Sequence, residues 1–153
     1  IALFALVLAE HAHAPIDLTR VLTMLILHDL VEIDSGDTPI HGAQDPSEQA
    51  ALEAQAAERI YGLLPDADRA RLQPIWEEFE AAERAEAIFA NARDRVQPVQ
   101  ANLAQDGGTW PEYNVTRDQL EARVGTKVAR GAKPIWDHLT PAVDRFFTKL
   151  HGS

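Results

Sequence analysis

Residues 27–39 read LHDLVEIDSGDTP and follow a strongly apolar run of the chain. The apolar spacing predicts one helix over residues 18–33, buried in the middle of a helical bundle because it is apolar nearly all round. Residues three and four positions apart share a helix face, so Glu32 is predicted to lie beside both His28 and Asp29. These three ionisable groups are therefore expected to extend an apolar stripe toward the core.

A buried carboxylate needs a compensating partner, or it takes up a proton. For the His28-Asp29 dipeptide alone, an ordinary buried hydrogen bond is the simpler interpretation, with Glu32 and Asp37 exposed. Gly36, however, permits a sharp turn that would bring Asp37 back toward the pair. Taken together and placed after so apolar a helix, the stretch favours a bound metal ion.

A second candidate ligand, Asp94, lies in a predicted helix at residues 83–104, on a stripe of alanines. Such small side chains would let another helix approach closely, so Asp94 is a candidate to meet His28. A surface salt bridge from Asp94 to Arg93 or Arg95 fits equally well, and the spacing alone leaves both interpretations open.

The string His28-Asp29-x-x-Glu32, continued by Gly36-Asp37-Thr38 and supported by residues 86–98, resembles the HD-domain superfamily of metal-dependent phosphohydrolases. Within it, the stretch is most similar to the branch of bacterial 5′-deoxynucleotidases. The resemblance implies an all-α HD-domain helical bundle that forms a single domain over residues 1–153. It further implies a homo-oligomer, expected to be a dimer.

The resemblance implies that His28, Asp29 and Asp94 ligate a divalent metal. Mixed imidazole and carboxylate ligands suit the transition ions Mn, Co, Fe, Ni or Zn better than Ca. Because the chain begins inside the family's first helix, a further metal-binding histidine and a phosphate-holding basic residue are expected upstream of Ile1. At Arg93 the chain departs from the family, which usually has an apolar residue there.

The resemblance also assigns catalytic roles to Glu32 and Asp37 and a substrate contact to Thr38. The implied substrate is a small phosphorylated molecule, such as a nucleoside 5′-monophosphate. Two alternatives remain: a non-catalytic HD-like scaffold that binds a nucleotide or a partner, and, with less support, an iron oxygenase. The oxygenase would need more histidines near His28, whereas His41 lies in a loop and is expected to be exposed.

The composition excludes several classes of function. The 153 residues include no cysteine, which excludes disulfides, zinc-thiolate sites and thiol catalysis and fits a cytoplasmic protein. The net charge of −10 disfavours binding to a nucleic acid polymer, since that needs many basic side chains. The apolar opening, residues 1–9, is too short to span a membrane, and no signal peptide is predicted.

Capping and breaker residues divide the rest of the chain. Asp17, Asp45 and Thr116 are predicted N-caps, and a break is expected at residues 131–134 before a last helix. The acidic run at residues 77–80 is expected to form a solvated face.

Overall fold

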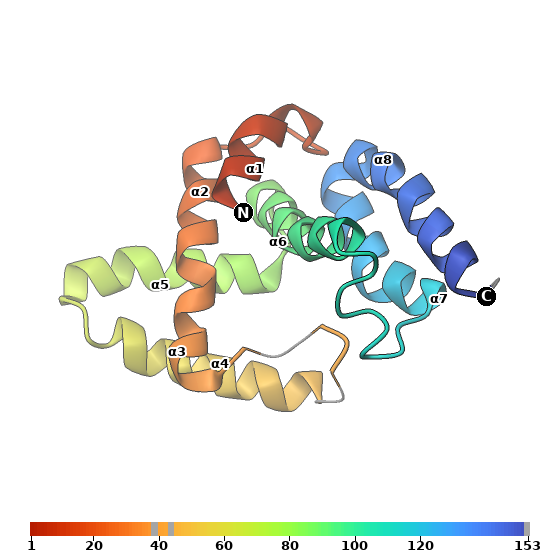
Figure 1. Ribbon diagram of the computed structural model, residues 1–153. Coiled ribbons are helices and arrows are strands. Elements are labelled where there is room, and N and C mark those ends of the chain that lie inside the picture. Colours follow the sequence, from red (N-terminus) through yellow and green to blue (C-terminus); the bar gives the residue numbers. More distant parts are fainter. Residues whose placement is uncertain (38–39, 43–44, 152–153) are drawn as a thin grey trace.

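The computed structural model describes residues 1–37, 40–42 and 45–151, and these residues form helices and no strand, which confirms the predicted all-α class (Figure 1). None of the helices in these ranges is long and apolar enough to cross a membrane. The helices are α1 (Ala2–Leu8), α2 (Leu18–Leu27), α3 (Glu32–Ser35), α4 (Pro46–Tyr61), α5 (Asp66–Ala81), α6 (Ala85–Ala104), α7 (Arg117–Leu120) and α8 (Thr126–His151), with 3-10 turns at Ala9–His11 and His28–Val31 and a π-helical turn at Glu121–Gly125.

The three predicted N-caps are confirmed. The Asp17 carboxylate accepts hydrogen bonds from the backbone N–H groups of Thr19 and Arg20, and the Asp45 carboxylate accepts one from Ser47. Thr116 forms a capping box with Gln119 at the start of α7. Each cap satisfies backbone donors that the first helical turn leaves without a partner.

The centre of the bundle is α6, with α2 on one side and α8 on the other (Figure 1). This corrects the expectation that residues 18–33 occupy the middle. One side of that segment faces solvent, where Ile26 is 67% and Ile33 is 72% exposed. The helix is apolar on nearly every side, but only one side of it is buried.

The segment 18–33 is also not one regular helix. It tightens into a 3-10 turn at His28–Val31 before α3 begins. Leu27 is the last residue of α2, and its carbonyl oxygen accepts a hydrogen bond of 3.3 Å from the Tyr61 hydroxyl of α4. A tertiary contact therefore supports the place where the helix changes its winding.

The predicted break near residues 131–134 is a kink at Ala132, whose φ of −159° and ψ of 66° are not helical. Beside it, the Gly131 backbone lies so near α6 that an added Cβ would approach the Ile88 carbonyl oxygen to 2.5 Å. Glycine thus permits the close packing of α6 and α8 that builds most of the core.

Two apolar clusters form the core. The larger one joins α1, α2, α6 and α8 and includes Val21, Met24, Phe89, Val96, Trp110, Val128 and Val143. The smaller one joins the end of α2 to α4 and α5 and contains Leu27, Val31, Ala56, Ala57, Tyr61 and Trp76.

Candidate metal centre

His28 stands where α2 ends, and its imidazole is 7% exposed. The ring packs against Phe79 of α5, with ring centroids 4.9 Å apart. Its Nδ1 lies 3.0 Å from the Leu25 carbonyl oxygen, which can only accept a hydrogen bond, so Nδ1 carries the proton. The other ring nitrogen, Nε2, is then left with its lone pair for a ligand.

Two carboxylates converge on this nitrogen. Asp29 Oδ1 lies 2.9 Å and Asp94 Oδ1 lies 3.5 Å from His28 Nε2. The nitrogen is buried, and no residue that the structure describes makes a hydrogen bond of good geometry to it. Burial opposes protonation of the imidazole, but the nearby carboxylates of Asp94 and Asp29 outweigh it and raise the pKa of His28.

The residues present fit a metal ion in their chemistry. A buried lone pair that faces two carboxylates is an electron-rich site that a cation would satisfy. Among residues 1–37, 40–42 and 45–151, however, no three His, Asp or Glu side chains are already arranged around a common point as metal ligands are. Asp29, with a side chain 60% exposed, also faces outward rather than into the core, contrary to expectation.

The predicted catalytic residues Glu32 and Asp37 line the same cavity as Asp29 and Asp94, which has a volume of about 530 Å³. Gly36 makes the turn that ends α3, with φ 76° and ψ 158°, a conformation reserved for glycine. The predicted turn at Gly36 is therefore confirmed. Thr38 lies outside the described residues.

The cavity is strongly acidic. Burial and the charges of Asp29 and Asp37 raise the pKa of Glu32 to about 7. Burial, together with the charge of Glu53, raises the pKa of Glu80 to about 6. Carboxylates with raised pKa values gathered in one cavity are typical of a functional site.

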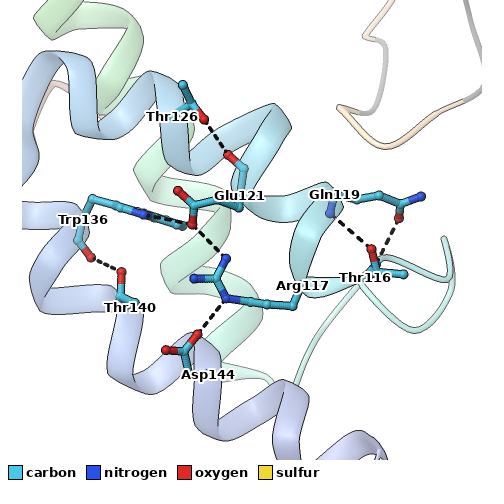
Figure 2. A network of polar contacts seen from close by, with 8 residues as sticks. All are labelled: Thr116, Arg117, Gln119, Glu121, Thr126, Trp136, Thr140 and Asp144. Atoms are coloured by element: carbon cyan, nitrogen blue, oxygen red, sulfur yellow. Dashed lines mark hydrogen bonds and ion pairs between the residues drawn. The ribbon is translucent and has the colours of Figure 1, made fainter.

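The cavity lining also includes apolar side chains, among them Ile40, Val99, Trp110, Leu120 and Val124. Leu120 directly precedes the π-helical turn and Val124 lies within it, and this turn is held by the polar network shown in Figure 2. In that network the Glu121 carboxylate accepts hydrogen bonds from Arg117 at 2.8 Å and from Trp136 Nε1 at 3.3 Å. Single π-helical turns are frequent at functional sites.

Several residues of the cavity were missed from the sequence. His41, expected to be exposed, is half-buried and lines the cavity. Glu77 and Glu80 are exposed, as expected of the acidic run at residues 77–80, although Glu80 also lines the cavity. Glu78 differs from the expectation, because it is half-buried and paired with Arg20. Arg95 was weighed only as a surface partner of Asp94. No spacing in the sequence distinguishes these inward side chains from solvated ones.

Known proteins match the chain over most of its length. The sequence profile of the family described as HD domain matches residues 1–136. The human and mouse proteins named 5′-deoxynucleotidase HDDC2 are 31% and 30% identical over 88 residues, which is 57% of this chain. The chain spans 43% and 44% of the lengths of these two relatives.

A solved structure has the same fold. The crystal structure described as a predicted metal-dependent phosphohydrolase from Magnetospirillum magnetotacticum MS-1 superposes with a TM-score of 0.86 and 39% identity. The match covers 95% of this chain and 74% of that one. On the sequence profile and the shared fold together, this chain belongs to the HD-domain family.

Proposed function

We propose that the protein is a metal-dependent phosphohydrolase that acts on a nucleoside 5′-monophosphate or a similar small phosphomonoester. The observation that carries this proposal is the convergence of Asp29 and Asp94 on His28 Nε2, beside a cavity lined by Glu32 and Asp37. The names of the similar proteins support the class of reaction and the class of substrate.

His28, Asp29 and Asp94 would hold the divalent ion, together with a histidine upstream of Ile1. This donor set suits Mn, Co, Fe, Ni or Zn. A bound ion of this kind supplies a Lewis acid that polarises the phosphoryl group and lowers the pKa of a water molecule.

Glu32 would take the proton of the attacking water. A carboxylate whose pKa is about 7 exchanges protons readily at neutral pH. Asp37, on the same cavity wall, would align the nucleophile or protonate the leaving oxygen as the ester P–O bond breaks. The products are an alcohol and inorganic phosphate, and Thr38 is proposed to contact the substrate.

The lining of the cavity supports a substrate with a polar and an apolar part. The candidate metal ligands would face the phosphate group, and the apolar lining residues would contact the sugar and base. A volume of about 530 Å³ lies in the range that small-molecule sites usually occupy.

The test is hydrolysis by the Mn- or Co-loaded protein of a panel of ribo- and deoxynucleoside 5′-monophosphates, with phosphate release as the measurement. A bis-ester of phosphate serves as the matched control and should not react. If the metal-loaded protein binds these nucleotides and hydrolyses none of them, the non-catalytic scaffold is the better description.

A further inference from the structure

Arg95 of α6 is the one lysine or arginine among the described residues that line the cavity. Six carboxyl-bearing residues line the same cavity: Asp29, Glu32, Asp37, Glu53, Glu80 and Asp94. The Nε atom of Arg95 is buried, and within the described parts of the chain Arg95 makes neither a hydrogen bond nor an ion pair. The Arg95 guanidinium thus has hydrogen-bond donors available for a ligand, although it lies in an acidic cavity.

Most other described arginines differ from Arg95 in this respect. They are held by carboxylates in the pairs Arg20–Glu78, Arg59–Asp34, Arg69–Glu58, Arg71–Asp68, Arg84–Glu78, Arg117–Glu121 and Arg117–Asp144. The positive charge of Arg95 reaches Glu80, whose pKa it lowers against the larger effect of burial, but no carboxylate comes within ion-pair distance. Acidic residues therefore lie in the same cavity as Arg95, but none of the described ones forms an ion pair with it.

We propose that Arg95 binds the phosphate group of the substrate and selects for it. This rests on the proposed function and names a residue that recognises its substrate. Arginine matches two phosphate oxygens at once through its planar donors, whereas the surrounding carboxylates repel a dianion. Because Arg95 follows Asp94 directly and lines the same cavity, a phosphate held there would sit beside the candidate metal ligands.

The test measures binding as well as turnover, with Arg95→Met, Arg95→Gln and Arg95→Lys made in the Mn-loaded protein. Titration calorimetry uses three probes: inorganic phosphate, a deoxynucleoside 5′-monophosphate and the matching deoxynucleoside. Loss of charge-assisted hydrogen bonds should weaken phosphate and nucleotide binding roughly 10- to 100-fold in Arg95→Met. Binding of the deoxynucleoside should not change, and Arg95→Lys should recover part of the affinity.

Arg130→Met is the matched control, because Arg130 is exposed on α8 and is absent from the cavity wall. It removes the same charge and should leave all three affinities unchanged. Circular dichroism establishes that each variant is folded; should Arg95→Met fail to fold, Arg95→Gln and Arg95→Lys carry the test.

The outcomes separate this proposal from the proposed function. If the unmodified protein hydrolyses the nucleotide but Arg95→Met keeps its KM and its phosphate affinity, the anion site is wrong and the function stands. If the unmodified protein binds phosphate through Arg95 but hydrolyses nothing, the anion site stands and the function fails. Equal weakening by Arg130→Met would overturn the assignment, since it would show a general effect of charge.

Discussion

Asp94 of α6 reaches His28 at the end of α2, with Oδ1 3.5 Å from Nε2. Small side chains make this possible, because Ala87 and Ala90 on α6 are fully buried and let the two helices approach. The contact joins the two blocks of sequence that resemble the HD-domain family. The alternative, a surface salt bridge from Asp94 to Arg93 or Arg95, is not observed: Arg93 is fully buried, and neither arginine pairs with Asp94 among the described residues.

If Asp94 is a metal ligand, Asp94→Asn should remove bound metal and hydrolysis together, since the amide does not supply the negative charge that a divalent ion requires. Metal content by inductively coupled plasma mass spectrometry and phosphate release are the measurements. Asp34→Asn is the control, because Asp34 pairs with Arg59 away from the cavity. Full metal occupancy in Asp94→Asn would contradict the assignment.

Glu32→Gln and Asp37→Asn should keep metal content close to that of the unmodified protein and lower kcat by roughly 10²–10⁴-fold. The reason is that both residues line the cavity without touching His28, so each is assigned to proton transfer rather than to ligation. Turnover at saturating nucleotide, normalised to bound metal, is the measurement. Wild-type turnover in both variants would remove their catalytic roles.

The metal-free protein should lose stability as the pH rises from about 4.5 to about 7. The folded state keeps the Glu32 proton up to a pKa of about 7, whereas the unfolded chain releases it near the ordinary value of 4.5. The unfolded state therefore binds fewer protons in this window, and the free energy of unfolding falls, by about 2–3 kcal/mol from Glu32.

Urea unfolding in the presence of a chelator, at about pH 5 and about pH 7.5, checks this dependence. The raised pKa of His28 acts in the same direction, so the informative quantity is the difference between the unmodified protein and Glu32→Gln. An identical pH dependence in the two proteins would show that Glu32 titrates normally.

Arg93→Met should leave stability unchanged or raise it by about 1–3 kcal/mol. Arg93 is 0% exposed, its three guanidinium nitrogens find no partner among the described residues, and burial lowers its pKa to about 10. Its one favourable contact of note is with the Phe89 ring, whose centroid lies 4.9 Å from Cζ, and methionine can also pack there. Thermal unfolding is the measurement, and a loss above about 1 kcal/mol would reveal a hidden partner of Arg93.

Gly36→Ala should destabilise the protein by about 1–3 kcal/mol, because an added Cβ meets no atom within 4 Å and the cost is backbone strain alone. Turnover should fall as well, since the turn positions Asp37. Ala82→Gly is the reverse exchange: Ala82 ends α5 in the left-handed conformation, with φ 47° and ψ 42°, and glycine there should stabilise. A neutral Gly36→Ala would show that the turn adapts.

The sequence by itself determined the local features: the helices, their caps at Asp17, Asp45 and Thr116, and the turn at Gly36. These depend on residues within one or two helical turns, so periodicity and single side chains suffice to specify them. The adjacent His28-Asp29 pair belongs to the same class. This pair indicates the candidate site without any knowledge of how the helices pack.

Tertiary structure decided which side chains share the cavity. Glu80 and Arg95 line it while Glu78 pairs elsewhere, and the segment after Leu27 tightens into a 3-10 turn where Tyr61 contacts it. Amphipathic spacing tells which face of a helix is apolar, but not which neighbour will cover a polar residue at the edge of that face. That choice depends on how distant helices pack, and packing gathered the acids around one unpaired guanidinium.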